Sequence, residues 1–154
     1  RLHQGTLTVL PAPFDLAANA CHLNRYANGG TTAATATLTG TIAPGDVFVV
    51  CNPQAGNVLL PLCDVTTSLI TFNGDDAMEL ECGTTKYDVI GQIGFDPGTQ
   101  WGSSPTTTLD ATLRRKCSVT VGDTNGGDAF DPSVEWAGFP TDTFSGLGDP
   151  ACAP

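Results

Sequence analysis

Short runs of alternating hydrophobic and polar residues recur about every ten residues along this sequence, separated by Gly, Pro, Asn and Asp. Alternation with a period of two is typical of β-strands, and the longer period of an amphipathic helix is hard to find. Many short strands at regular spacing indicate a sandwich or a barrel. The strands predicted in this way are residues 5–10, 21–26, 34–40, 46–51, 69–72, 77–82, 87–93 and 111–116.

The clearest predicted strand is residues 77–82, where Met, Leu and Cys alternate with Glu79 and Glu81. Because successive side chains of a strand point to opposite faces, the strand should have one apolar inner face and one acidic outer face. We interpret the two Glu residues as a solvated face rather than as a pair for acid–base chemistry. Residues 83–86 predict a turn that leads into the strand at residues 87–93.

The sequence after Lys116 is rich in Gly, Asp, Asn and Pro, and we predict an irregular lid there rather than strands. Phe130, Trp136, Phe139 and Phe144 are spaced through this region. Large aromatic residues between turns usually fill the end of a sandwich. A platform on which a ligand stacks is the alternative.

Length and charge narrow the classes of function. The 154 residues suffice for one hydrophobic core, so we predict a single domain over residues 1–154. With 40% hydrophobic and 14% charged residues the chain is globular in composition, and no apolar run is long enough to span a bilayer. The formal net charge of −10 repels phosphate groups, so we expect neither a nucleic-acid partner nor membrane insertion.

The cysteines predict an oxidising compartment, and therefore an extracellular protein. They form no Cys-x-x-Cys pair and no zinc-binding pattern with His, which leaves disulfides as the main interpretation and buried thiols as the alternative. The pairing that we predict, one of fifteen possible for six cysteines, joins Cys51 to Cys63, Cys82 to Cys117 and Cys21 to Cys152.

No set of residues predicts an enzyme, and we assign no catalytic residue. His3 and His22 are the only histidines, and neither lies in a catalytic motif. The sequence contains no Gly-x-Ser-x-Gly elbow and no phosphate-binding loop. Asp75 and Asp76 are adjacent carboxylates at a predicted turn, where such residues more often accept backbone N–H groups than catalyse.

The basic residues Arg114, Arg115 and Lys116 form the only basic cluster of the sequence. They are either a small anion-binding patch or the partners of carboxylates across a sheet. Because acidic residues are in large excess, we expect pairing.

No cofactor is predicted, and Ca²⁺ is the one metal for which weak candidate ligands exist. Their hard oxygen atoms suit the ion. The spacing fails the EF-hand pattern, which requires a Gly at position six and a bidentate Glu at position twelve. The candidate ligands are Asp123, Asn125, Asp128 and Asp131.

Several motifs in a fixed order resemble the bacterial branch of the lamin tail domain, over residues 15–149. The individual motifs are short, and their order makes the resemblance specific. They are Asn-Arg-Tyr-Ala-Asn-Gly-Gly at 24–30, Phe-Asn-Gly-Asp-Asp-Ala-Met-Glu-Leu at 72–80, Asp-Val-Ile-Gly-Gln-Ile-Gly-Phe-Asp-Pro-Gly at 88–98 with Trp101, Thr-Leu-Arg-Arg-Lys at 112–116 and Phe-Asp-Pro-Ser-Val-Glu-Trp at 130–136.

The resemblance implies an all-β, immunoglobulin-like β-sandwich that is not itself catalytic. Domains of this family occur beside secreted nucleases and phosphoesterases or in surface proteins, and their expected role is attachment. We therefore predict a non-catalytic extracellular structural or interaction module, with an accessory attachment domain of such an enzyme as the alternative. Independently of the resemblance, a further alternative is a carbohydrate-binding module in which Trp101 and Trp136 stack on sugars. Fold-level analogy does not fix function.

Compared with that family, the chain begins too late to hold the whole first strand. A sheet without its edge strand presents unpaired backbone groups, so we predict an interaction edge at Thr6, Thr8 and Leu10. Strand addition between copies at such an edge would give an oligomer or a surface fibre. The Thr-rich segments at 30–41 and 103–108 are possible sites of O-glycans.

Overall fold

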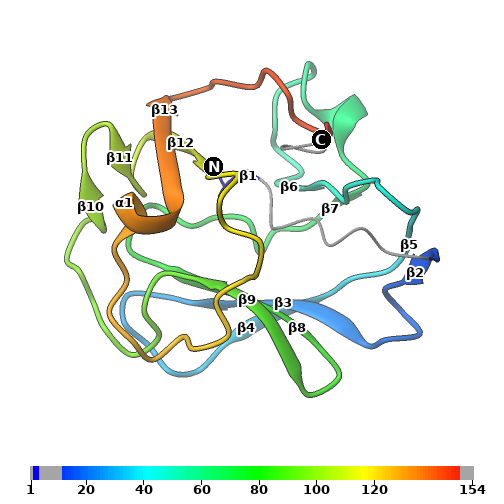
Figure 1. The fold of residues 1–154 in the computed structure, drawn as a ribbon, viewed down its shortest axis with the longest axis horizontal. Coiled ribbons are helices and arrows are strands. Elements are labelled where there is room, and N and C mark those ends of the chain that lie inside the picture. Colours follow the sequence, from blue (N-terminus) through cyan, green and yellow to red (C-terminus); the bar gives the residue numbers. More distant parts are fainter. Residues whose placement is uncertain (1, 4–11, 150–154) are drawn as a thin grey trace.

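The computed structural model describes residues 2–3, by their backbone, and residues 12–149. The protein is all-β, with several sheets and a single short helix in the described part. A four-stranded sheet and a three-stranded sheet form two layers (Figure 1). Three further strand pairs flank these layers: β2 (Phe14–Asp15) with β5 (Thr41–Ile42), β6 (Val50–Cys51) with β7 (Val65–Thr66), and β10 (Gly102–Ser103) with β11 (Thr106–Thr107).

The four-stranded sheet is antiparallel throughout, in the order β4-β3-β8-β9. Its strands are β4 (Ala34–Thr37), β3 (Cys21–Tyr26), β8 (Ala77–Cys82) and β9 (Thr85–Ile90). The hairpin predicted from the alternation of residues 77–82 is present. Its tight turn contains Gly83 at φ +62°, a backbone conformation that glycine adopts without steric cost.

The three-stranded sheet has the order β1-β12-β13. β12 (Ala111–Arg115) pairs antiparallel with β13 (Trp136–Pro140) and parallel with the two residues of β1 (Leu2–His3). The helix α1 (Pro132–Glu135) leads directly into β13, and a 3-10 turn, η1 (Leu60–Leu62), lies between β6 and β7.

One hydrophobic cluster joins the two sheets. Met78 and Ile90 come from the four-stranded sheet, Leu113 and Trp136 from the three-stranded sheet, and Leu69 from the segment between β7 and β8. A second cluster surrounds Leu16, Cys21 and Leu38 near the β2–β5 pair. Both sheets therefore bury one face, as the alternation in the sequence requires.

The predicted strands are partly wrong in the connecting segments. Residues 69–72 form no strand, because local turn hydrogen bonds such as that from the Thr71 amide to the Leu69 carbonyl shape the backbone there. β13 lies inside the region predicted as an irregular lid. Its Gly138 interrupts the alternation for a steric reason, since a Cβ there would lie 1.9 Å from the Pro105 carbonyl oxygen.

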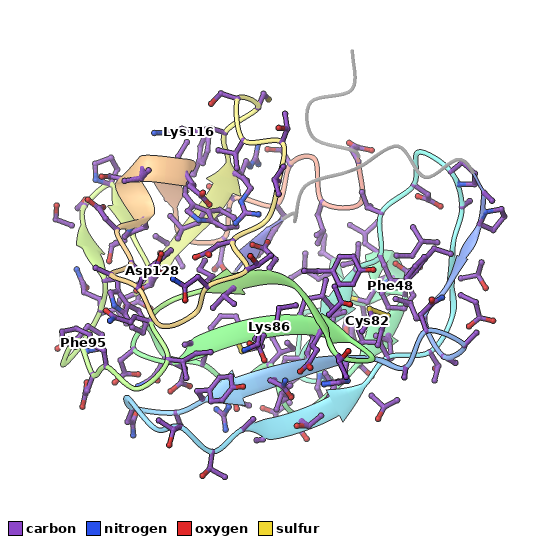
Figure 2. The ribbon with its side chains drawn as sticks, turned by 60° about the horizontal axis from the view of Figure 1, so that its bottom comes forward. Phe48, Cys82, Lys86, Phe95, Lys116 and Asp128 are labelled. Atoms are coloured by element: carbon purple, nitrogen blue, oxygen red, sulfur yellow. A yellow bond between two sulfur atoms is a disulfide. The ribbon has the colours of Figure 1, made fainter. Side chains whose placement is uncertain are left out.

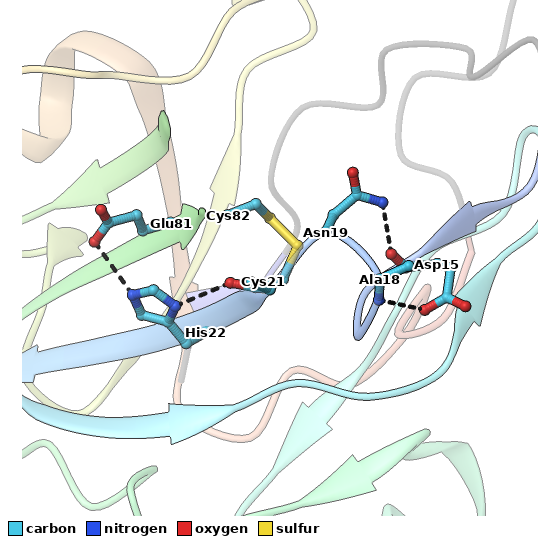
Figure 3. Close-up of a disulfide and its surroundings, with 8 residues drawn as sticks. Asp15, Ala18, Asn19, Cys21, His22, Glu81 and Cys82 are labelled. Atoms are coloured by element: carbon cyan, nitrogen blue, oxygen red, sulfur yellow. Dashed lines mark hydrogen bonds and ion pairs between the residues drawn. A yellow bond between two sulfur atoms is a disulfide. The ribbon is translucent and has the colours of Figure 1, made fainter. Parts of the chain in front are cut away.

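Two disulfides lie within the described residues, and one of them was predicted. Cys51 bonds to Cys63 as expected. Cys21 bonds to Cys82, so the predicted pairings of Cys21 with Cys152 and of Cys82 with Cys117 are wrong (Figure 3). Cys117 is also disulfide-bonded, and Cys152 lies outside the described residues.

The physical reason for this correction is strand register. Cys21 and Cys82 stand directly opposite each other on β3 and β8, with their Cα atoms 3.9 Å apart. Sequence separation says nothing about register, and the two cysteines are 61 residues apart.

Arg115 links the two sheets through a buried ion pair. Its side chain is 3% exposed, and its Nη atoms donate to both oxygens of Asp88 on β9, at 2.6 and 2.8 Å. Arg115 also donates to Glu135 at 3.1 Å and lies over the Trp136 ring. The predicted pairing of the basic cluster with carboxylates is confirmed at this residue.

The other two residues of the basic cluster are held at the surface of the same sheet. Arg114 lies over the Phe139 ring and donates to the side-chain oxygen of Ser145. Lys116 donates to the backbone carbonyl oxygens of Ser133 and Val134 in α1. The three side chains thus serve the packing of β12 and do not converge on an anion site.

Removing the Asp88 side chain should leave the Arg115 guanidinium buried between the sheets without its main carboxylate partner. We expect Asp88→Ala to lower the free energy of unfolding by about 3 kcal/mol or more, because the remaining buried charge has lost its bidentate partner. Asp96→Ala is the matched control, since Asp96 also accepts a backbone N–H but is exposed, and it should change stability by about 0.5 kcal/mol or less. Urea unfolding measures both. Equal small losses would show that the ion pair does not support the sandwich.

Candidate interaction surface

Two of the residues considered for catalysis, His22 and Asp76, have structural partners. The His22 ring lies 3.2 Å from a Glu81 carboxylate oxygen and 3.2 Å from the Ala20 carbonyl oxygen (Figure 3). Asp76 accepts from the backbone amide of Asn28 and from Arg25, as the interpretation of turn acids requires. Asp75 is 8% exposed, and its Oδ1 has no hydrogen-bond partner among the described residues. The side chain of His3 lies outside the described residues.

The four candidate Ca²⁺ ligands are not brought together as a site. Asp123 and Asn125 each accept a backbone N–H two residues further along the chain. Asp131 caps α1 by accepting the Ser133 amide, and these hydrogen bonds lower the pKa of its carboxyl group. Among residues 12–149, no three His, Cys, Asp or Glu side chains are placed to hold a metal ion.

The two tryptophans are buried and cannot present their rings to a sugar. Trp101 is 5% exposed and Trp136 is 4% exposed. Trp101 packs edge-on against Phe130, with ring centroids 5.8 Å apart, and Arg115 covers the ring of Trp136. Of the four aromatics predicted to fill the interior, Trp136 lies in the core and Phe130 packs against it, so the prediction is confirmed for these two. The burial of both tryptophans removes the residues on which the carbohydrate-binding alternative rested.

A line of polar side chains crosses all four strands on the outer face of the larger sheet. The Thr35 hydroxyl on β4 donates to Oδ1 of the Asn24 side chain on β3 at 2.7 Å. The side-chain amide (Nδ2) of Asn24 donates to Glu79 on β8 at 3.0 Å, and Lys86 on β9 donates to the other Glu79 carboxylate oxygen at 2.5 Å. We call these four residues the polar ladder.

Glu79 is the centre of the polar ladder and is only 1% exposed, so the prediction of a solvated acidic face is wrong at this residue. The alternation identified its face correctly but not the side chains that cover it. In addition to the ladder bonds, the Tyr26 hydroxyl donates to Glu79 at 3.0 Å. These bonds satisfy a carboxylate that would otherwise be costly to bury.

The polar ladder fixes the ionisation of its members. Burial raises the pKa of Glu79, but hydrogen bonds from Lys86, Asn24 and Tyr26 outweigh it, and the net pKa is lowered. Burial and the hydrogen bond to Glu79 raise the pKa of Tyr26 to about 12. Glu79 is therefore a carboxylate and Tyr26 a neutral phenol at neutral pH.

One edge of this sheet, β9, is covered by the chain itself. The Asp123 amide donates to Asp88, and the amide of Ile93, just beyond the strand, donates to the Gly126 carbonyl oxygen. Gly122 approaches so closely that a Cβ there would lie 2.1 Å from the Tyr87 carbonyl oxygen. Residues 122–126 therefore shield β9 from another strand.

The opposite edge, β4, is open. Among the described residues β3 is its only neighbour in the sheet, and Ala34, Thr35 and Thr37 are exposed while Ala36 is half-buried. Within the part of the chain that the structure describes, the backbone of β4 forms backbone–backbone hydrogen bonds with β3 alone. Figure 2 shows β4 as the outermost strand of the sheet.

Natural proteins usually protect an edge strand with charge, proline or a bulge. β4 has none of these devices, and residues 26–45 contain no charged side chain at all. This uncharged stretch is the signal in the sequence that could have located the edge. The edge predicted at Thr6, Thr8 and Leu10 lies outside the described residues.

Acid should weaken the polar ladder. Because the folded-state pKa of Glu79 lies below its ordinary value of 4.5, its contribution to stability is present above that pH and is lost as the pH falls through the folded-state pKa. We expect Glu79→Gln to lose about 2 kcal/mol at pH 7 and to approach the stability of the unmodified protein at pH 2 to 3. Thermal unfolding across this range measures the difference.

Glu81→Gln provides the matched control for this experiment. Glu81 lies on the same strand and face, but its carboxylate is more exposed, so the loss at pH 7 should be smaller. A Glu79→Gln deficit that did not shrink in acid would contradict the assignment.

Comparison of the chain with models of known protein families, with curated proteins and with solved structures finds no match. Within the described residues, no helix has the length and apolar character needed to cross a membrane. The function therefore has to be argued from the geometry of the sheet.

Proposed function

We propose that this protein is a non-catalytic, extracellular structural or interaction module that associates with protein strands through the open edge of β4. The observation that carries the proposal is the exposed, uncharged β4, which has β3 as its one neighbouring strand within residues 12–149. An extended segment placed beside such an edge gains main-chain hydrogen bonds without any change in the sheet.

The described disulfides support the extracellular part of the proposal. Cys21–Cys82 fastens two neighbouring strands, and Cys51–Cys63 closes a short loop. Such bonds form and persist in an oxidising environment. Because β4 pairs with β3, and β3 is cross-linked to β8, the edge strand lies on a covalently braced sheet.

The immunoglobulin-like arrangement and membership of the lamin tail family belong to the same proposal. The motifs that carry the resemblance include residues with central positions here: Asn24 and Glu79 in the polar ladder, and Asp88 and Arg115 in the buried ion pair. Trp136 lies in the shared core. A domain with these properties would serve attachment, and repeated association through strand edges would give an oligomer or a fibre.

A positive charge on the edge should weaken the association. Thr37→Lys places a solvated ammonium where a second strand would lie, whereas Thr84→Lys adds the same charge in the exposed β8–β9 turn. Sedimentation equilibrium of the unmodified protein should show a mass that rises with concentration. We expect the dissociation constant to increase at least about tenfold in Thr37→Lys and to stay unchanged in Thr84→Lys.

The proposal fails if the unmodified protein remains monomeric at millimolar concentration, or if the two lysine variants associate alike.

A further inference from the structure

We propose that the partner of β4 is β4 of a second copy, paired antiparallel about a two-fold axis that passes midway between the two Ala36 residues. This inference rests on the proposed function, namely that β4 accepts a protein strand. It adds the identity of the partner, the direction of the strands and their register.

The register follows from the hydrogen bonds of β4 to β3. The Leu38 amide donates to the Cys21 carbonyl oxygen at 2.8 Å, one step beyond the pair His22–Thr37. Because backbone groups alternate in direction along an antiparallel strand, the N–H and C=O groups of Ala36 also point toward β3. Those of Thr35 and Thr37 therefore point away from the sheet, toward a new strand.

Two copies of this edge can pair all the outward-pointing backbone N–H and C=O groups of Thr35 and Thr37. If Thr35 stands opposite Thr37 of the second copy, and Thr37 opposite Thr35, the two residues of each strand exchange four N–H···O=C bonds. Ala36 then faces Ala36 of the second copy as the intervening pair without hydrogen bonds. The sequence Thr35-Ala36-Thr37 reads the same in both directions, so each strand meets an identical pattern.

The side chains also continue across this interface. Opposed residues share a face of the sheet, so Ala36 would meet Ala36 on the core side, and threonines would meet threonines on the outer side. The polar ladder, which ends at Thr35, would reach the corresponding threonine of the second copy. Small side chains leave room for the two strands to approach to the usual spacing.

Charge favours this part of the surface for contact between identical copies. Each chain has a formal net charge of −10, so two copies repel each other over most orientations. Residues 26–45 carry no charge, and Arg25, the charged residue just before them, is paired with Asp76. Self-association should therefore strengthen as salt screens the remaining repulsion.

The resulting assembly is closed. Pairing of the two β4 strands gives one continuous eight-stranded sheet, whose outer edges are the two β9 strands. Both of these edges are covered by residues 122–126. This interface alone thus produces a dimer, and a longer polymer requires a second surface on each copy.

Cysteine substitutions can test the register in the intact protein. Ala36→Cys places one thiol on each side of the axis, where Cα atoms of a pair without hydrogen bonds lie about 4.5 Å apart, within the range that a disulfide spans. We expect Ala36→Cys to form a covalent dimer on mild oxidation. Thr35→Cys and Thr37→Cys should each link poorly to themselves but readily to each other when mixed. Ser103→Cys, on the exposed β10, gives the background rate of random linking.

The outcomes separate this inference from the proposed function. Efficient self-linking of Thr35→Cys or Thr37→Cys, or no linking in the mixture, would overturn the register. A third outcome is that the unmodified protein associates and Thr37→Lys weakens the association, but no cysteine variant links above the Ser103→Cys background. In that case β4 still accepts a protein strand, as the proposed function states, but the strand it accepts is not β4 of a second copy. Should Ala36→Cys fail to fold, the Thr35→Cys and Thr37→Cys mixture decides, since both side chains are exposed.

Discussion

The backbone of an outermost β-strand has hydrogen-bonding groups on both sides, and only one side is satisfied by its own sheet. In this protein that constraint falls on two residues, Thr35 and Thr37, whose N–H and C=O groups point away from β3. Water can satisfy them in the isolated chain, and another strand can replace the water. The opposite edge strand, β9, is covered by residues 122–126, which block the approach of another strand.

The rest of the structure keeps this edge strand ordered and extended in the isolated chain. The polar ladder joins β4 to β3, β8 and β9 through consecutive hydrogen bonds, so the edge strand is tied to the whole sheet. Behind the sheet, the Arg115–Asp88 pair and the cluster around Leu113 fasten it to the second layer. A strand that is already ordered loses little conformational entropy on pairing, which favours association.

The sequence predicts those parts of the fold that depend on alternation. Residues 21–26 and 77–82 form strands with the predicted limits because apolar and polar residues alternate over 21–24 and 78–82 and both strands end at turns. β13 escaped prediction because Gly138 and Pro140 break its pattern, and the need for Gly138 arises from the Pro105 backbone, which is distant in sequence. Strand register also depends on residues that are distant in the sequence. Spacing alone therefore predicts neither the Cys21–Cys82 bond nor the burial of Glu79 by side chains of the neighbouring strands.

The most direct test of the account is amide hydrogen exchange along β4, measured by NMR at low and high protein concentration. The Ala36 amide points toward β3 and should be protected at both concentrations, whereas the Thr35 and Thr37 amides should exchange fast in dilute solution. As the mass of the species increases, we predict that Thr35 and Thr37 become protected together. If they continue to exchange fast while the protein associates, the open edge is not the surface through which it works.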